Sequence, residues 1–476
     1  MRADVAVVGG GITGLTTALL LAEAGKRVVL LEGRRLGAGV TGATTAHLTE
    51  VVDTRYHRLA SSFGRDGAEQ VRASSRDAIE LIAAWARAAS LDCGFRRVNG
   101  FLFAADEQQA KELERELAAA EQAGARVEPA EVRLLSGARP AVRFADQAQL
   151  DQPLAYLAAI HARMPARTVQ VFEQTPMVEL SGSGPFEVVT GAGAKVVADA
   201  VVLATHSAFA KLSLQLKLAQ YRSYVVAGRS DQGFDGLFWD LNDPYHYLRQ
   251  ANVGGQAYVI VGGQDHRTGQ QPDDGRADAP YARLEDYAAH LGVPTQERWS
   301  SQVVESADGL PFIGRPDPDR HLYVATGFGG NGMTFGTLAA MLISDAILGR
   351  KNRYAELYRA NRAKPLASLA AVVAENADTV GEMVAGHWHR ASQLPLAELP
   401  IGVGRVVQEN GERLAVYRDQ DGQLHALSAI CTHQGCQVAF NASERSWDCP
   451  CHGSRFDLDG RVLDGPATKP LERRQR

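Results

Sequence analysis

The sequence has no long apolar run and no excess of basic charge. Its 476 residues carry 50 Lys and Arg against 55 Asp and Glu, which gives a formal net charge of −5. This balance gives no electrostatic reason to expect binding to nucleic acid or to an anionic membrane. No stretch offers about 18 uninterrupted apolar residues, so we expect no membrane span. Glycines interrupt the apolar segment 5–22, which makes it a poor signal peptide, and we expect a cytoplasmic protein.

Cysteine is also scarce, and its distribution is uneven. Four of the five cysteines lie between positions 431 and 451, and Cys93 stands alone. We expect Cys93 to be a small buried apolar residue. Crowded cysteines in a cytoplasmic chain favour a metal site over a disulfide framework.

The N-terminal segment has the pattern of a dinucleotide-binding unit. A short apolar strand over 4–8 leads directly into Gly9-Gly10-Gly11-Ile12-Thr13-Gly14, a helix over 12–24 and a second strand over 28–31. We expect Gly9 to form the tight turn, Gly11 to let a pyrophosphate approach and Gly14 to permit close helix packing. Glu32 ends the second strand, where an acid accepts hydrogen bonds from ribose hydroxyls.

Three further segments distinguish FAD from NAD as the expected nucleotide. Residues 37–48 read GAGVTGATTAHL, residues 306–314 read SADGLPFIG, and residues 322–336 read LYVATGFGGNGMTFG. These segments, with the strand VVLAT at 201–205, resemble the D-amino acid oxidase-like family of flavoproteins. The resemblance implies an α/β Rossmann-type FAD-binding domain together with a mostly antiparallel substrate sheet, to which the β-rich segments 221–228, 245–250 and 257–263 are suited.

The same resemblance implies a set of residues that contact FAD. A helix over 333–348 is expected to point its N-terminus at the flavin ring edge. The implied contacts are Gly9, Gly11, Ile12, Thr13, Gly14, Glu32, Gly42, Thr44, Thr45, Ala46, Val178, Ala204, Thr205, Gly329, Gly330, Asn331, Gly332, Met333 and Thr334.

The pattern changes near Lys364-Pro365. An Ala-rich helix over 367–386 is expected to be a connector, and short strands with turn signals at 409–411 and 419–422 predict a small all-β domain. We therefore expect an oxidoreductase domain over 1–362, a helical linker over 363–394 and a β domain over 395–476.

The β domain contains Cys431-Thr432-His433 and Cys449-Pro450-Cys451-His452. Two thiolates and two imidazoles on two loops would also suit zinc. Each loop carries one more cysteine, however, in CTHQGC and CPCHGS, and such loops resemble those of Rieske [2Fe–2S] proteins from cytochrome bc complexes. The resemblance implies that Cys431 and Cys449 bind one iron, that His433 and His452 bind the other, and that Cys436 and Cys451 form a disulfide. The stretch 460–466, GRVLDGP, resembles the proline loop that covers such a cluster.

The two cofactors together indicate an enzyme that takes up two electrons at once and releases them one at a time. A flavin accepts two electrons, whereas a Rieske cluster passes one at a time. The family mostly oxidises C–N bonds, so we expect a small amine or amino-acid-like substrate and an external one-electron acceptor such as a quinone, cytochrome or ferredoxin-like protein. An oxidase that returns electrons to oxygen, electron flow from an outside donor to the flavin, and a redox sensor without a metabolite substrate remain alternatives.

Candidate catalytic residues are fewer. Many relatives place a carboxylate-binding arginine shortly before the DGLP segment, but residues 299–307, WSSQVVESA, contain none. Tyr247 and Arg249 alternate onto one face of a predicted strand and are possible replacements, although exposed strand residues would give the same pattern. We call the segment 37–48 the flavin loop. His47, near its end, is a candidate base or attachment point, and we expect FAD to be bound noncovalently.

Overall fold

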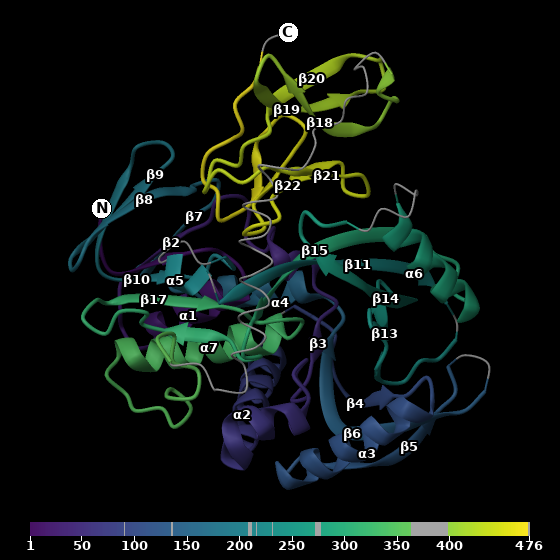
Figure 1. The fold of residues 1–476 in the computed structure, drawn as a ribbon. Coiled ribbons are helices and arrows are strands. Elements are labelled where there is room, and N and C mark those ends of the chain that lie inside the picture. Colours follow the sequence, from purple (N-terminus) through teal and green to yellow (C-terminus); the bar gives the residue numbers. More distant parts are fainter. Residues whose placement is uncertain are drawn as a thin grey trace.

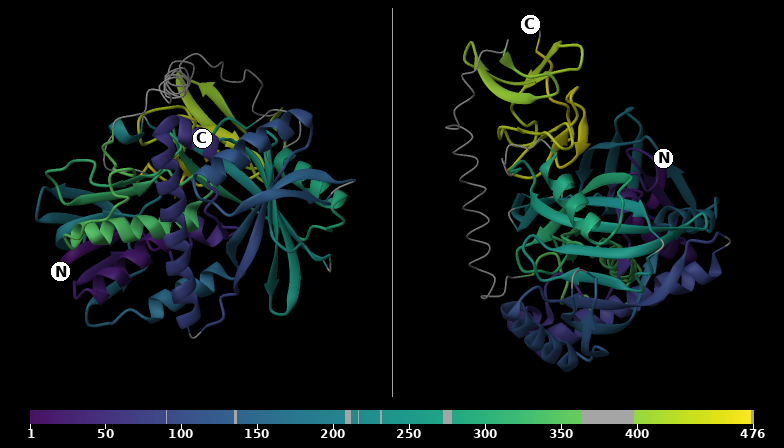
Figure 2. Two further views of the ribbon diagram at one scale, coloured as in Figure 1. Left: turned by 90° about the horizontal axis from the view of Figure 1, so that it is seen from below. Right: turned by 90° about the vertical axis from the view of Figure 1, so that its right-hand side faces the viewer.

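The computed structural model describes residues 1–474 except 90, 135–136, 208–211, 216, 231, 272–277 and 363–397. The chain forms a larger N-terminal part with two large sheets and a smaller C-terminal β domain, which lies on top of it in Figure 1. The second view of Figure 2 shows the C-terminal domain seated at one end of the larger part. The predicted connector helix over 367–386 lies outside the described residues.

The first sheet carries the nucleotide-binding unit. Its strand order is β16-β17-β10-β1-β2-β7, and β8 and β9 extend it from β10. Strand β1 lies parallel to both β10 and β2, with Ala6 opposite Val201 and Val29. The strands are β1 Arg2–Val8, β2 Val28–Leu31, β7 Val169–Phe172, β8 Met177–Gly182, β9 Phe186–Thr190, β10 Lys195–Leu203, β16 Phe312–Gly314 and β17 Leu322–Thr326.

The second sheet is mostly antiparallel, as the sequence predicts for a substrate sheet. Its order is β15-β11-β14-β13-β12-β4-β6-β3, with β5 paired to β6, and β12 to β4 is a parallel pair. The strands are β3 His47–Leu48, β4 Phe95–Phe103, β5 Val127–Val132, β6 Arg139–Leu150, β11 Leu218–Arg229, β12 Leu237–Asp240, β13 His246–Val253, β14 Gln256–Arg267 and β15 Glu297–Ser306.

Helices cover the first sheet and join it to the second. Helix α1 packs against α7, and both are almost fully buried, because their apolar residues occupy nearly every face. Helix α2 is kinked at Gly64, where the backbone leaves the helical region. The helices are α1 Ile12–Glu23, η1 Val40–Ala43, α2 Tyr56–Ala88, α3 Glu107–Gln122, α4 Pro153–Ala162, α5 Leu212–Gln215, α6 Ala279–His290 and α7 Gly332–Ile347.

The C-terminal domain contains two small antiparallel sheets. One has the order β18-β19-β20, and the other β21-β22-β23-β24. Asn410 and Gly411 both have positive φ and form the tight turn between β18 and β19, as the turn signal predicts. The strands are β18 Gly404–Glu409, β19 Glu412–Arg418, β20 Leu424–Ser428, β21 Ala439–Asn441, β22 Ser446–Asp448, β23 Arg455–Phe456 and β24 Val462–Asp464. The predicted fold class is therefore confirmed.

Candidate functional site

The first functional feature is a cavity above the β1–α1 turn. Gly9 has φ +110°, and a side chain there would collide with the carbonyl oxygen of Ala204. A Cβ on Gly14 would lie 1.9 Å from the carbonyl oxygen of Gly9. Only glycine permits this close turn, which leaves the N-terminus of α1 open toward the cavity, where the positive end of the helix dipole suits phosphate oxygens.

Glu32 occupies the expected position at the end of β2 and has a second role. Its Oε2 accepts a hydrogen bond from the Gly10 N–H at 2.6 Å, and its Oε1 accepts from the Arg34 N–H at 2.7 Å. The carboxylate lines the cavity. Glu32 thus braces the glycine turn while its remaining lone pairs stay available for hydroxyl donors of a nucleotide.

Most of the residues expected to contact FAD line this cavity or the one beside it. Those in the first cavity are Gly9, Gly11, Ile12, Thr13, Glu32, Thr44, Ala204, Thr205, Gly329, Gly332 and Met333. Thr45, Gly330 and Asn331 line only the second cavity.

Five expected contacts lie in neither cavity lining. Gly14 packs against Gly9, Ala46 and Thr334 are fully buried, and Gly42 faces the carbonyl oxygen of Gly37. Val178 is 46 % exposed, and its neighbour Met177 lines the cavity instead, because alternate residues of a strand face opposite sides. The FAD contact expected of Val178 therefore stays a prediction.

A second cavity of about 350 Å³ adjoins the first and shares Val40, Thr44, Gly329 and Gly332 with it. Its walls come from the flavin loop, the start of α2 and the second sheet. Aromatic and ionisable side chains are concentrated here, among them His47, Asp53, Arg55, Trp239, Tyr245 and Tyr247. A cavity of this composition beside a nucleotide site suits a small polar substrate.

His47 and Tyr247 both line the second cavity. Their rings meet edge to face with centroids 5.5 Å apart, and His47 Nδ1 lies 3.1 Å from Thr45 Oγ1. Burial, and next the charge of Arg249, lowers the pKa of His47 to about 3. The ring is therefore neutral at physiological pH, and it is a weak base that can still accept or donate a hydrogen bond.

Arg249 does not line the cavity, contrary to the suggestion that it contacts substrate. Its side chain is 1 % exposed and forms an ion pair with Asp151 at 3.2 Å. The guanidinium also donates to the carbonyl oxygens of Thr45 and Leu150. Arg249 shares a strand face with Tyr247, but its donors are consumed by the backbone beneath the flavin loop.

Sequence reasoning missed Arg55, which lines the second cavity. Asp53, the acidic side chain closest to it in sequence, accepts a hydrogen bond from the Gly330 N–H. Within the described part of the chain no carboxylate lies within ion-pair distance of the Arg55 guanidinium. Burial lowers the pKa of Arg55. The signal was the Asp-Thr-Arg sequence at 53–55, shortly after the flavin loop, which is uninformative until β3 and α2 are placed.

Asp265 was also missed, since its strand carries no motif. Its carboxyl is hydrogen-bonded to Ser223 and Tyr245, two residues of the second cavity. Burial is the main cause that raises the pKa of Asp265 to about 7.

The four expected cluster ligands converge between two loops of the C-terminal domain. Cys431 and Cys449 are buried free thiols that are hydrogen-bonded to each other. The rings of His433 and His452 have centroids 5.0 Å apart. The Nδ1 atoms of both rings are buried without a hydrogen-bond partner. Orphaned ring nitrogens beside paired thiols are the donor set that a [2Fe–2S] cluster needs, so the residues fit it.

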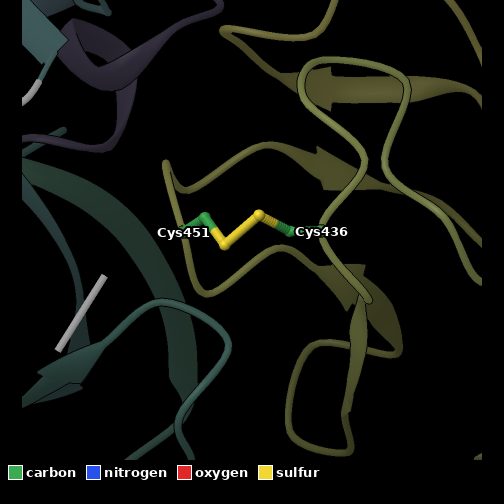
Figure 3. Close-up of a disulfide and its surroundings, with 2 residues drawn as sticks. All are labelled: Cys436 and Cys451. Carbon is green, nitrogen blue, oxygen red and sulfur yellow. A yellow bond between two sulfur atoms is a disulfide. The ribbon is translucent and has the colours of Figure 1, made fainter. Parts of the chain in front are cut away.

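A disulfide joins Cys436 to Cys451 across the same two loops (Figure 3). The sulfur atoms of both lie within 4.8 Å of the Cys449 sulfur. The bridge therefore lies directly against a ligand and restrains both loops. Ser454, on the second loop, has its hydroxyl hydrogen-bonded to the Cys431 sulfur and accepts from the Ala467 N–H.

The two histidine loops differ in their surroundings. His433 is half-buried with exposed neighbours, whereas His452 is only 4 % exposed. Next to His452, the carbonyl oxygen of Gly453 accepts a hydrogen bond from Gln302 Nε2 at 2.8 Å. Gln302 also lines the first cavity, so one side chain touches both the cluster loop and the nucleotide site.

Among the helices of the described residues, none has the length and apolar character needed to cross a membrane.

Comparison with known proteins agrees with both halves of this arrangement. Residues 4–346 match the family model "DAO: FAD dependent oxidoreductase", and residues 390–474 match "Rieske [2Fe-2S] domain". The Bacillus subtilis protein YhfW, described as a Rieske 2Fe-2S iron-sulfur protein, is 32 % identical over 98 % of this chain and 92 % of its own.

More distant relatives match the larger part alone. The gamma-glutamylputrescine oxidoreductase of Escherichia coli is 24 % identical over 74 % of this chain and 85 % of its own. The crystal structure of glycine oxidase from Geobacillus kaustophilus superimposes with a TM-score of 0.64 and 22 % identity, over 76 % of this chain and 99 % of that one. The chain belongs to the DAO family of FAD-dependent oxidoreductases and carries a C-terminal Rieske [2Fe–2S] domain.

Proposed function

We propose that this oxidoreductase oxidises a small amine or amino-acid-like substrate in the second cavity and delivers the electrons one at a time, through the Rieske domain, to an external acceptor. The observation that carries the proposal is Gln302, which lines the nucleotide cavity and donates to the Gly453 carbonyl beside His452. FAD supplies acceptance of a hydride from the substrate, and the cluster supplies single-electron transfer.

Arg55 gives the proposed substrate an orientation. Its guanidinium lines the cavity without an ion-pair partner among the described residues, so a carboxylate of the substrate can satisfy it. Tyr245 and Tyr247 line the same cavity with ring centroids 5.7 Å apart and supply an apolar wall for the substrate. His47, kept neutral by burial, can hold the substrate nitrogen by a hydrogen bond.

Anaerobic stopped-flow mixing with a panel of amines and amino acids tests this function. A substrate should bleach the flavin absorbance with saturation, and bleaching of the cluster bands should follow. Stoichiometric peroxide in air would instead identify an oxidase with a subsidiary cluster. No saturable bleaching with any compound would favour a redox sensor, and reduction of the flavin only by a reduced electron carrier would reverse the direction.

The variant Arg55→Ala distinguishes loss of carboxylate binding from a general loss of activity. We expect the variant to raise the KM for an amino acid by about 10- to 100-fold, as for loss of a charge-assisted hydrogen bond. The KM for the matching amine without a carboxylate should change little. Equal losses for both compounds would contradict the assigned role of Arg55.

The acceptor is proposed to be a quinone, a cytochrome or a ferredoxin-like protein that meets the half-exposed His433 side of the cluster loops. The cytoplasmic location expected from the sequence belongs to this proposal too, and cell fractionation tests it.

A further inference from the structure

Two residues of the Rieske domain lie in the wall of the FAD cavity. Asp464 ends strand β24, Gly465 follows it, and both line the cavity together with Gly9, Glu32 and Thr205 of the flavin domain. They belong to the stretch 460–466 that resembles the proline loop of a Rieske centre. One loop therefore borders the FAD cavity in this structure, and its resemblance implies that it also covers the cluster.

Hydrogen bonds join this loop region to other residues of the same cavity. Ser207 Oγ donates to the Gly465 carbonyl oxygen at 3.4 Å, and Gln302 Nε2 donates to the Gly453 carbonyl oxygen at 2.8 Å. Ser207 and Gln302 both line the FAD cavity. The contact between the domains is thus continuous with the nucleotide site.

A buried ionic network holds the domains in this register. Glu444 of the Rieske domain forms an ion pair with Arg222 of β11 at 3.1 Å and accepts hydrogen bonds from Tyr281 and Ser300. The Arg222 side chain is only 2 % exposed. A buried charge of this kind requires its partner, so the flavin domain is built to receive Glu444.

The network extends to the cavity wall. Arg455 lies 3.8 Å from Glu444 and 3.1 Å from Asp464, and its side chain is 7 % exposed. The same guanidinium also pairs with Asp448. The position of Asp464 at the FAD cavity is therefore mechanically linked to the Glu444 contact.

We propose that the FAD site is shared between the two domains: Asp464 and Gly465 of the Rieske domain close its wall, and FAD leaves only when the Rieske domain lifts from the flavin domain. The Asp464 carboxylate suits hydroxyl donors of FAD rather than its phosphates, since it carries the same charge sign as the phosphates. The proposal goes beyond the proposed function, because it concerns FAD retention in the resting holoprotein and needs no substrate.

A substitution that adds a side chain at the contact between the domains provides the first test. Gly269 has φ +80°, and a Cβ there would lie 2.6 Å from the nitrogen and 2.8 Å from the Cα of Pro450 in the Rieske domain. Gly255 has φ +78° with nothing within 4 Å of its Cβ. Gly269→Ala and Gly255→Ala therefore impose the same backbone strain, but only the first forces the domains apart.

The measurement is the rate of FAD release from the full-length holoprotein, followed by FAD fluorescence with an excess of an unrelated apoflavoprotein that captures free FAD. Gly269→Ala should release FAD about tenfold faster or more, and Gly255→Ala within about twofold of the wild type. The EPR signal of the reduced cluster, recorded on the same samples, should remain in both.

A second variant opens the contact far from the cluster ligands. Glu444→Gln removes the charge that Arg222 and Arg455 require, while Glu412→Gln removes an exposed ion pair with Arg474 in the same domain. Glu444→Gln should accelerate FAD release with the cluster signal and far-UV circular dichroism unchanged, and Glu412→Gln should not. Wild-type release rates in both Gly269→Ala and Glu444→Gln would overturn the shared site.

Discussion

The two cofactor sites of this chain differ in the protein groups that form them. The FAD cavity is lined mainly by backbone and small side chains gathered from segments between Val8 and Gly465. The cluster ligands, by contrast, are four side chains from two loops between residues 431 and 452. Loss of one of many lining groups should weaken FAD binding only in part, whereas loss of one of four ligands should remove the cluster. The same contrast predicts how each site responds to substitution.

The largest effect is expected at a cluster ligand. His433→Ala removes one of the two imidazoles, so the EPR signal of mixed histidine–cysteine ligation should disappear completely while FAD stays bound. Gln434→Ala, at the exposed position next to it, is the control and should keep the signal. A partial signal in His433→Ala would break the comparison, since the cluster site would then tolerate loss of a ligand.

A graded effect is expected at the FAD site. Glu32→Ala removes the acceptor for the Gly10 N–H and for ribose hydroxyls, which should weaken FAD binding by about 1–3 kcal/mol, or about 5- to 150-fold. Glu23→Ala breaks only an exposed ion pair with Arg163 and should change little. Equilibrium titration of apoprotein with FAD measures both, and an unchanged constant for Glu32→Ala would remove Glu32 from the site.

A smaller effect is expected on the reduction potential of the cluster. Rieske proteins of cytochrome bc complexes carry a tyrosine two residues after the serine of this loop, where this chain has Phe456, fully buried in strand β23. Phe456→Tyr should raise the reduction potential by about 30–60 mV, because a hydroxyl donor to cluster sulfur stabilises the reduced state. Ser454→Ala should lower it, since it deletes the hydroxyl that contacts Cys431. Redox titration checks both signs, and an unchanged potential in Phe456→Tyr would show that the missing hydroxyl does not set it.

The smallest effect concerns charge beside the second cavity. Burial raises the pKa of Asp265 to about 7, so its carboxyl is neutral below that pH and negative above it. A cationic amine should bind about three- to fivefold more tightly as the pH rises through 7. Asp265→Asn should flatten the pH dependence of KM, and Asp243→Asn, which alters another acid of the cavity, should keep it. Identical profiles for wild type and Asp265→Asn would exclude this charge.

The contrast between the sites also explains what the sequence could reveal. The cluster ligands belong to a compact pattern of rare residue types, and the structure brings together all four that were named. The glycine turn and Glu32 were equally legible, because strand, turn and helix adjoin in the chain. Arg55, Asp265 and Asp464 could not be identified in this way. Arg55 and Asp464 line their cavities, and Asp265 is hydrogen-bonded to two residues of the second cavity, only because segments distant in sequence pack together. Arg249 was named as a substrate contact for the same reason. Strand alternation predicts the face on which its side chain lies, but it does not reveal that the guanidinium already pairs with Asp151.

The Arg222–Glu444 pair has a consequence for the spread of electron-transfer rates. Any rotated or slid arrangement of the domains separates the Arg222 guanidinium from the Glu444 carboxylate, and breaking a buried ion pair costs about 3–5 kcal/mol. Competing arrangements are then populated at well below one molecule in a hundred. The separation between the two redox centres is accordingly a single value rather than a distribution. Electron transfer between the flavin and the cluster should therefore follow one exponential, and Glu444→Gln should turn it into several.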